Sequence, residues 1–321
     1  MRAARIQELG TAPVLTEVDE PARAEDQALV APAAVPLNPV DIATGSGRFY
    51  EGSPPTPYTP GSEGVGRVAD AGSLAAGARV YFSGNGLGRT RDGALAELAV
   101  VAEEAAFDVP DDVSDELAAA CGTAGLSGWL PVVWRAGTTQ ADRVLVLGAT
   151  GIVGLAAVQA ARTIGAARVV AAGRRPEGLA FAAQVGADAT VSLEEPDLAA
   201  ALREAAGGDG PTVVIDPLWG EPIDAALEAA ARGARIVQLG QSAGATAELR
   251  SSLVRGKQLE ILGFSILRVP VKLRREVYAA LTRHAAAGEV RFPIEAYPLE
   301  RVAEAWERQA AGPGAKIVVT I

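Results

Sequence analysis

Residues 143–159 are the part of the chain that most constrains its fold. The apolar run Arg143-Val144-Leu145-Val146-Leu147 leads into the small-residue turn Gly148-Ala149-Thr150-Gly151, and a helical pattern begins directly afterwards. A strand that enters a helix through such a turn leaves the first N–H groups of the helix free, beside the positive end of the helix dipole. Phosphate groups bind at helix ends of this kind. The segment therefore predicts a strand, turn and helix that hold the pyrophosphate of a dinucleotide.

Individual positions in the turn support this interpretation. Gly151 lets the backbone approach the phosphates, Gly154 lets the helix pack against the strand, and Ala149 stands where the dinucleotide fingerprint usually has its first glycine. A tight strand-to-helix turn in some other α/β protein is the alternative. The residues of this turn that we expect to bind the cofactor are Ala149, Thr150, Gly151, Ile152, Val153 and Gly154.

The middle of the chain alternates short β-branched or apolar runs with alanine-rich helical patterns. This alternation is typical of a parallel sheet with helices on both faces. The sequence thus predicts a doubly wound α/β domain over residues 116–267. The expected strands are Arg143–Leu147, Arg168–Ala172, Ala189–Val191, Thr212–Asp216, Arg235–Leu239 and Leu259–Leu262. The expected helices are Gly154–Thr163, Glu177–Gln184, Asp197–Ala206 and Pro222–Ala231.

The first third of the chain has many Pro and Gly turns between short apolar runs, which is typical of a mostly β domain. The pattern changes near Ser114, so we expect residues 1–115 to form this domain. The tail, residues 268–321, has helical patterns at Val271–Ala287 and Leu299–Ala310 and ends in a short apolar strand. Because one strand and two helices make a poor core, we expect the tail to complete the β domain.

The end of the second expected strand bears on the choice of cofactor. NAD sites commonly have a carboxylate about 20 residues past the glycine loop, whereas NADP sites supply cations for the 2′-phosphate. Here Gly173-Arg174-Arg175 follows the strand without a carboxylate. Arginine suits a phosphate because its planar group donates hydrogen bonds in pairs. The pair favours NADP(H), and the alternative is that both arginines are solvated loop charges.

Composition excludes several classes of site. The 321 residues include one Cys (Cys121) and one His (His284), so disulfide frameworks, zinc fingers and multi-histidine metal sites are ruled out. The net charge of −10 argues against nucleic acid or acidic membranes as partners and favours a small molecule. Because we find neither a signal-peptide core nor an uninterrupted apolar segment of about 18 residues, we expect a cytoplasmic protein.

Six motifs in a fixed order extend the interpretation over the whole chain. They are Pro36-Leu37-Asn38-Pro39-Val40-Asp41, Tyr58-Thr59-Pro60-Gly61-Ser62-Glu63-Gly64, Gly93-Ala94-Leu95-Ala96-Glu97, Ala124-Gly125-Leu126-Ser127, the dinucleotide turn, and Gly314-Ala315-Lys316-Ile317-Val318. Together they resemble the medium-chain dehydrogenase/reductase superfamily, and within it the zinc-independent quinone oxidoreductase (zeta-crystallin-like) branch. The resemblance implies a GroES-like β domain, a Rossmann domain and an active site in the cleft between them.

The resemblance also bears on metal binding. In the zinc-dependent relatives a Cys, a His and a further Cys or Asp hold the catalytic zinc, and by motif alignment these positions fall on Asn38, Ser62 and Thr123. None of these is a suitable zinc ligand. Cys121 is two residues from the third position, but we interpret it as a small buried hydrophobic residue. The resemblance thus implies a metal-free enzyme.

A metal-free site is poorly suited to oxidising an alcohol, whereas a quinone or an α,β-unsaturated carbonyl compound delocalises the added charge itself. The resemblance therefore implies an NADPH-dependent quinone or enone reductase. Its candidate catalytic hydrogen-bond donors are Asn38 and Tyr50; alternatively, Asn38 caps its own loop and Tyr50 is a pocket wall. The alternative functions are a zinc-type alcohol dehydrogenase and a non-catalytic NADPH-binding sensor or structural protein.

The resemblance further implies a homodimer and additional cofactor contacts. The dimer is expected to form through the edge of the Rossmann sheet, at Gln258–Gly263. Lys316 either approaches the cofactor or is a solvated lysine near the C-terminus. The expected cofactor contacts outside the turn are Ser127, Gly173, Arg174, Arg175, Gly240, Gln241, Ser242, Phe264, Ser265, Ile266 and Lys316.

Overall fold

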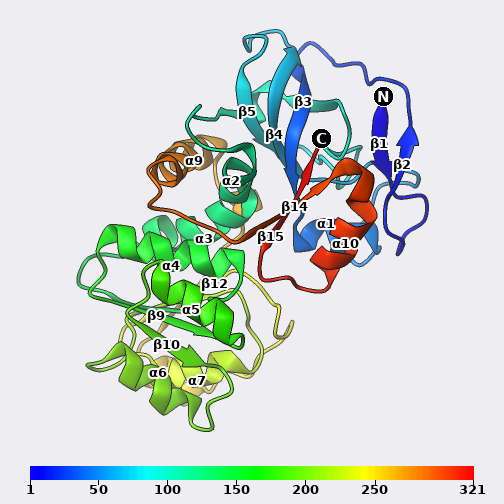
Figure 1. Ribbon diagram of the computed structural model, residues 1–321. Coiled ribbons are helices and arrows are strands. Elements are labelled where there is room, and N and C mark those ends of the chain that lie inside the picture. Colours follow the sequence, from blue (N-terminus) through cyan, green and yellow to red (C-terminus); the bar gives the residue numbers. More distant parts are fainter. The chain divides into compact units, whose positions relative to one another are not determined.

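The computed structural model describes all 321 residues, which form two compact units (Figure 1). The first unit comprises Met1–Thr123 and Pro270–Ile321, and the second comprises Ala124–Val269. Each unit has its own sheet and its own hydrophobic core. The fold is therefore the expected combination of a mostly β unit and a doubly wound α/β unit.

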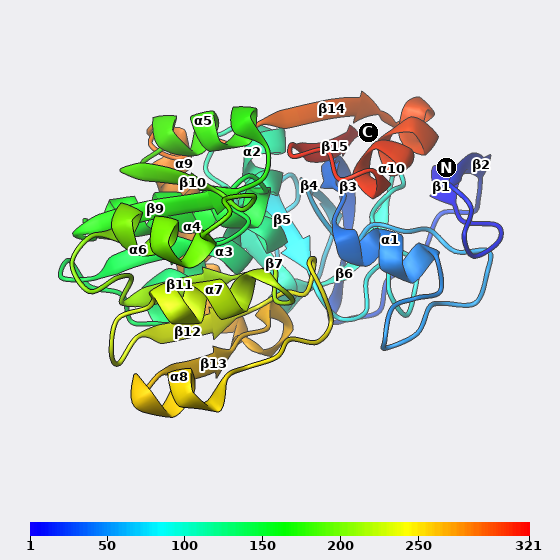
Figure 2. The ribbon, with the colours of Figure 1, turned by 90° about the horizontal axis from the view of Figure 1, so that it is seen from below.

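Six parallel strands form the sheet of the second unit, in the order β10-β9-β8-β11-β12-β13 (Figure 2). All six predicted strands are confirmed, with their ends within one residue of the predicted positions. Their bounds are β8 (Arg143–Val146), β9 (Arg168–Gly173), β10 (Ala189–Ser192), β11 (Val213–Asp216), β12 (Arg235–Gln238) and β13 (Glu260–Gly263). Because β8 lies between β9 and β11, the direction in which the chain crosses the sheet changes at β8, and such a switch point is where α/β sheets bind ligands.

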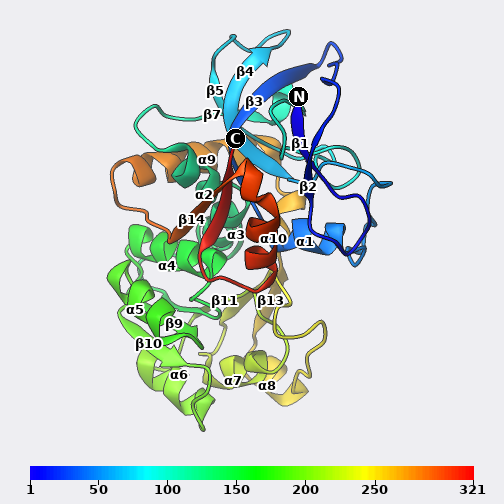
Figure 3. The ribbon, with the colours of Figure 1, turned by 45° about the vertical axis from the view of Figure 1, so that its right-hand side comes forward.

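Helices cover both faces of this sheet, with α4 and α5 on one side and α6 and α7 on the other (Figure 3). All four predicted helices are confirmed, although α4 begins two residues before the predicted start. The helices of the unit are α3 (Leu126–Leu130), η3 (Pro131–Arg135), α4 (Ile152–Ile164), α5 (Pro176–Gln184), α6 (Leu198–Ala206), α7 (Pro222–Ala229), α8 (Ser251–Gly256) and η4 (Ile266–Arg268).

The central strands of the second unit are mostly apolar because both of their faces are buried. Leu145, Val170, Val214 and Ile236 are all fully buried and belong to one core cluster with residues of α6 and α7. Alanines dominate the buried faces of the helices, which lets the helices approach the sheet closely.

The first unit is built on a mainly antiparallel sheet with the order β14-β15-β3-β4-β5-β7, in which β6 also pairs with β3. A separate hairpin, β1-β2, lies at the N-terminus. The strands are β1 (Arg2–Arg5), β2 (Val14–Glu17), β3 (Gln27–Pro36), β4 (Glu63–Asp70), β5 (Arg79–Ser83), β6 (Ala99–Ala102), β7 (Ala106–Asp108), β14 (Ile294–Pro298) and β15 (Lys316–Thr320). The helices are α1 (Pro39–Gly45), η1 (Glu103–Ala105), α2 (Asp115–Ala120), α9 (Val271–Ala286), η5 (Leu299–Arg301) and α10 (Val302–Ala310).

The C-terminal tail completes the first unit, as the sequence predicts. β15 pairs antiparallel with β3, so that Val319 lies opposite Val35, and it pairs parallel with β14. The Trp306 side chain of α10 packs so closely on α1 that a Cβ at Gly45 would lie 2.6 Å from its ring. The tail therefore supplies both sheet strands and core side chains.

The first division between the units differs from the sequence prediction, at residues 123/124 rather than 115/116. The cause is α2, which lies against β3 and β4 of the first unit although its alanine-rich sequence resembles the helices of the second. The π-helix η2 (Cys121–Gly125) follows it, with a non-helical kink at Gly122. The second division is at 269/270, against 267/268 predicted.

The run Asp115–Arg135 is long and apolar enough to cross a membrane by length and composition, with a mean hydropathy of 1.3 in its best window. Of that window, however, 72% is buried inside the molecule, and the kink at Gly122 interrupts it. We therefore assign it as core helix.

Candidate functional site

The dinucleotide turn between β8 and α4 has the geometry expected of a phosphate site. Gly148 has a positive φ of 60°, and Gly151 is the N-cap of α4. No side chain caps this helix, so the N–H groups of its first turn are open to an anion. A Cβ at Gly151 would meet only the Gly148 oxygen, at 3.7 Å, so the space beside it is open. The turn therefore fits a pyrophosphate.

Two other glycines bring helices against this turn. A Cβ at Gly154 would lie 2.6 Å from the Ala149 Cα, so only glycine allows α4 to pack this closely on the turn. A Cβ at Gly128 of α3 would lie 2.6 Å from the Ala156 Cβ of α4. Ser127, which is half-buried and adjacent to Gly128, is thereby held next to the first turns of α4.

The end of β9 also lies against the dinucleotide turn. A Cβ at Gly173 would collide with the Thr150 side chain, and one at Gly178 would lie 2.6 Å from the Thr150 Cβ. The Arg175 guanidinium donates a hydrogen bond to the Thr150 carbonyl oxygen, whereas Arg174 is exposed. Of the two arginines expected at the 2′-phosphate, Arg175 therefore holds the turn and Arg174 has its side chain in solvent.

The loop after β11 is held in place by a carboxylate at the end of that strand. Asp216 ends β11, and its Oδ1 accepts hydrogen bonds from the backbone of Leu218 and Trp219, both at 2.9 Å. Trp219 has a positive φ of 54°, which these two bonds help to hold. Burial raises the pKa of Asp216, whose Oδ2 is buried without a hydrogen-bond partner. The expected cofactor residues included neither Trp219 nor the carboxylate that positions it.

The remaining expected cofactor contacts follow β12 and β13. The Ser242 hydroxyl and backbone N–H both donate to the Pro217 carbonyl oxygen, at 3.2 and 3.4 Å, and Gly240 is in close contact with the same residue. Gln241 and Ser265 are exposed, while Phe264 and Ile266 are half-buried. The carboxyl ends of β8, β9, β12 and β13 thus bring most of the expected cofactor residues to one edge of the second unit.

In the first unit, the expected residues Asn38 and Lys316 are in direct contact. The Lys316 ammonium donates to the Asn38 Oδ1 at 2.6 Å and to the Leu37 carbonyl oxygen at 3.0 Å. The Asn38 Nδ2 donates to the Glu63 Oε1 at 2.6 Å and reaches the Pro36 oxygen only at 3.4 Å. Lys316 is 3% exposed, so it is not the solvated lysine that one interpretation of the sequence allowed.

Two buried carboxylates connect the three positions that align with zinc ligands in other proteins. Asp41 accepts hydrogen bonds from the backbone of Asn38 at 2.8 Å and of Ser62 at 2.9 Å. Glu63 accepts from the Asn38 amide through one oxygen and from the backbone of Thr123, at 2.7 Å, through the other. Asn38, Ser62 and Thr123 are therefore held in one hydrogen-bonded network, which we call the Glu63 network.

Two stacked tyrosines extend this network, and one of them donates to Glu63. The Tyr81 hydroxyl donates to the Glu63 Oε2 at 2.6 Å and lies 3.4 Å from the Thr123 Oγ1. The Tyr278 ring stacks on Tyr81 with 4.5 Å between the ring centroids, and its hydroxyl donates to the Ala118 carbonyl oxygen. No local pattern marks Tyr81, because its role depends on the pairing of β5 with β4.

Burial dominates the electrostatics of the network. It raises the pKa of Asp41 to about 6, although hydrogen bonds from Asn38 and Ser62 favour the ionised form. It lowers the pKa of the Lys316 ammonium, against the pull of Glu63 and Asp41. Burial and the neighbouring Glu63 carboxylate raise the pKa of Tyr81 well above its ordinary value.

The donor set does not fit a catalytic zinc ion. The chain has no group of three or more His, Cys, Asp and Glu side chains that could hold a metal. The two carboxylates accept hydrogen bonds from the chain itself, and the ammonium of Lys316 already occupies the cationic position of the network. Cys121 is fully buried and burial raises the pKa of its thiol, which opposes the thiolate form that binds metals.

Tyr50, the second candidate donor, does not belong to the network. It is 80% exposed, in the loop after α1, and its ring lies 4.6 Å from that of Phe49. Its hydroxyl has no partner within the chain. The structure therefore brings Asn38 together with Lys316 but not with Tyr50.

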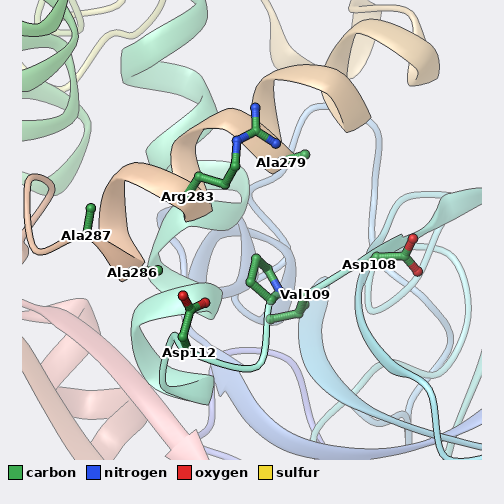
Figure 4. Close-up of a pocket in the computed structure, with 8 residues that line it drawn as sticks. Asp108, Val109, Asp112, Ala279, Arg283, Ala286 and Ala287 are labelled. Atoms are coloured by element: carbon green, nitrogen blue, oxygen red, sulfur yellow. The ribbon is translucent and has the colours of Figure 1, made fainter.

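A surface pocket of about 540 Å³ in the first unit includes none of the expected site residues (Figure 4). It lies between α9 and the loop that follows β7. Its lining residues are Asp108, Val109, Pro110, Asp112, Ala279, Arg283, Ala286 and Ala287.

Known proteins match this chain over its whole length. Residues 24–111 match a family model described as an alcohol dehydrogenase GroES-like domain, and residues 153–286 match one described as a zinc-binding dehydrogenase. Quinone oxidoreductases from Pongo abelii and Homo sapiens are each 30% identical over 323 residues, covering 98% of this chain and 95% of the relative. A solved structure described as an NAD-dependent alcohol dehydrogenase has a TM-score of 0.89 at 26% identity and covers 100% of both chains.

The raised pKa of Asp41 predicts a pH-dependent contribution to stability. The folded state holds this proton more tightly than the unfolded state, so the contribution falls as pH rises from about 4 to about 6. Asp41→Asn removes the titration. The free energy of unfolding that this variant loses should therefore be larger at pH 4 than at pH 7, by at most about 3 kcal/mol.

Urea unfolding of the wild type and of Asp41→Asn at several pH values between 4 and 7 measures this difference. Asp111→Asn, at an exposed position of the same unit, is the matched control and should show no such trend. A loss of stability that is the same at every pH would contradict the assignment of a buried, titrating Asp41.

Proposed function

The chain belongs to the quinone oxidoreductase branch of the medium-chain dehydrogenase/reductase superfamily, and from that premise we propose that it reduces a quinone or an α,β-unsaturated carbonyl compound with NADPH and without zinc. One observation carries the proposal. The positions that align with zinc ligands hold Asn38, Ser62 and Thr123, which are tied to two buried carboxylates and a buried ammonium. Such a site offers hydrogen bonds and no Lewis acid.

The proposed substrate class follows from this chemistry. An alcohol needs a metal or a strong base to stabilise the alkoxide from which hydride leaves. When bound, NADPH supplies a hydride, and a conjugated carbonyl compound or quinone spreads the resulting charge onto an oxygen. Side chains of this protein then need only to orient the acceptor and donate a hydrogen bond to that oxygen, while water supplies the proton.

Asn38 and Tyr50 are our candidates for direct contact with the substrate. The Asn38 amide is held between Lys316 and Glu63, so it would act from a fixed orientation. The Tyr50 hydroxyl is exposed and unpaired, so it is free to follow the substrate. We propose that Lys316 acts through Asn38 and does not bind the cofactor, because its ammonium is buried among groups of the first unit.

The choice of NADPH rests on Arg174. No carboxylate follows β9 before α5, and the exposed Arg174 is available for a 2′-phosphate. We assign the pyrophosphate to the turn at 149–154. The remaining contacts of the second unit are assigned to Ser127, Gly173, Arg175, Gly240, Gln241, Ser242, Phe264, Ser265 and Ile266. A cytoplasmic location stays a prediction from the sequence.

We also propose a homodimer that forms through β13. This strand is at the edge of its sheet, and its side chains are largely exposed, including Ile261 at 37%. Leu267, four residues beyond the strand, is 43% exposed. Trp134, 45% exposed, is next to Arg135, whose guanidinium donates to the Gly263 carbonyl oxygen. An unpaired apolar edge is a liability unless a second copy covers it.

Activity measurements test the proposed reaction. The purified protein is expected to oxidise NADPH in the presence of quinones or α,β-unsaturated ketones and to contain less than stoichiometric zinc by metal analysis. Tight NADPH binding without turnover across a broad panel would favour the sensor or structural alternative. Stoichiometric zinc with oxidation of simple alcohols would favour an alcohol dehydrogenase.

Substitution of Arg174 tests the cofactor assignment. Arg174→Ala should raise the Michaelis constant for NADPH roughly 10- to 100-fold, the loss expected when one charge-assisted contact to a phosphate is removed, and should leave that for NADH unchanged. Arg162→Ala removes another exposed arginine of the same unit, one that pairs with Asp188 at 3.7 Å, and is the control. Equal changes for NADPH and NADH in Arg174→Ala would refute the assignment.

A charged substitution in β13 tests the dimer. Ile261→Asp should convert the protein from dimer to monomer in sedimentation experiments, because it places a carboxylate in the proposed interface. Leu249→Asp changes a residue of the same exposure, 37%, away from the strand, and should leave the dimer intact. A wild-type protein that sediments as a monomer would also overturn the proposal.

A further inference from the structure

Two hydroxyls lie at the surface of the Glu63 network, those of Ser62 and Thr123. The Asn38 amide already donates to Glu63 and accepts from Lys316. These residues and Tyr81 are at most 4% exposed, whereas Thr123 is partly exposed. A substrate that reaches the network from outside would therefore meet Thr123 before its buried partners.

The backbone of Thr123 is fixed by a kink that requires glycine. At Gly122 the chain leaves the helical path, with φ −61° and ψ −133°, and the N–H of Thr123 turns to the Glu63 Oε2 at 2.7 Å. A Cβ at Gly122 would lie 2.5 Å from that same oxygen and would also collide with the Tyr81 ring. The position of Thr123 is therefore set by the network, although it lies at the end of the first unit.

The hydroxyl of Thr123 keeps its proton available. Tyr81 donates its own proton to Glu63 at 2.6 Å, so at the 3.4 Å contact with Thr123 the Tyr81 oxygen can act only as an acceptor. A contact of this length is weak for two hydroxyls. The Thr123 O–H can therefore turn to a better acceptor at little cost.

Ser62 is the other partly exposed hydroxyl at the aligned positions. It differs from Thr123 in the carboxylate beside it. The Asp41 carboxylate accepts two backbone hydrogen bonds, from Ser62 and Asn38. Glu63 accepts three, from Asn38, Tyr81 and Thr123, so a substrate oxygen beside Thr123 faces the better-satisfied carboxylate.

We propose that the Thr123 hydroxyl donates a hydrogen bond to the carbonyl oxygen of the substrate, an inference that rests on the proposed reductase function. As hydride from NADPH adds to the acceptor, an electron pair moves onto this oxygen, and the hydrogen bond strengthens as its charge grows. The proton stays on Thr123 throughout. Water supplies the proton of the product.

Thr123→Val tests the inference because it keeps the shape of the side chain and the N–H to Glu63 while removing the hydroxyl. With a quinone or enone that the wild type reduces, kcat should fall roughly 10- to 100-fold, as expected when one donor to a developing oxyanion is lost. Thr123→Ser should restore most of the rate. The Kd for NADPH from fluorescence titration and the melting temperature should stay close to the wild-type values.

Thr320→Val is the matched control. Thr320 lies in β15 of the same unit, is half-buried, and makes one equally long hydrogen bond of 3.4 Å to the Tyr297 carbonyl oxygen. It should keep the wild-type kcat.

The possible outcomes separate this inference from the proposed function. A wild type that reduces no quinone or enone overturns both. An active wild type whose Thr123→Val variant keeps kcat within about twofold overturns the role of Thr123 alone. A Thr123→Ser variant as slow as Thr123→Val does the same, because the methyl group would then be what matters. If Thr123→Val does not fold, Thr123→Ala replaces it in the comparison with Thr123→Ser.

Discussion

The first unit depends on one buried carboxylate, that of Glu63. This residue begins β4, and its two oxygens accept hydrogen bonds from the Asn38 amide, the Tyr81 hydroxyl and the backbone of Thr123. The three donors come from the turn before α1, from β5 and from η2. Because a buried carboxylate is costly without donors, one side chain fixes the relative positions of three elements.

The second unit depends instead on glycines, whose lack of a side chain lets its helices pack closely on the dinucleotide turn. At Gly154 the first turn of α4 contacts the preceding turn, and at Gly128 α3 contacts α4, at distances that a Cβ would not allow. At Gly151 no such contact exists, and the space beside the backbone is open. Glycines therefore have two distinct roles at this turn: most of them close the packing around it, and one leaves room for a ligand.

The elements of the second unit could be predicted because their signals are local. Apolar runs separated by alanine-rich helices specify a buried parallel sheet, and the six strands follow from that pattern. The division at 123/124 lies eight residues beyond the predicted 115/116, because alanine-rich composition shows that a segment is helical but not which core it joins. That assignment depends on contacts with β3 and β4, which are remote in sequence.

The polar network could be predicted only in part, for the same reason. Motif alignment identified Asn38 as a candidate, and the same motifs contain Asp41 and Glu63. It could not show that Lys316, 278 residues away, would donate to Asn38, since this follows from the pairing of β15 with β3. Nor does any local pattern mark Tyr81. Partners of a buried polar group are set by tertiary contacts, and a single sequence does not display them.

The network also links the chemistry of the site to the stability of the fold. Asp41, Glu63 and Lys316 are all nearly or fully buried, and removing one charge would leave its partners buried without compensation. Lys316 brings a single positive charge to two carboxylates, so the site has no surplus cation with which to bind an oxyanion. Stabilisation of a negatively charged intermediate must then come from neutral donors. A conjugated substrate meets this requirement, because such a substrate spreads the added charge and needs only a hydrogen bond at its oxygen.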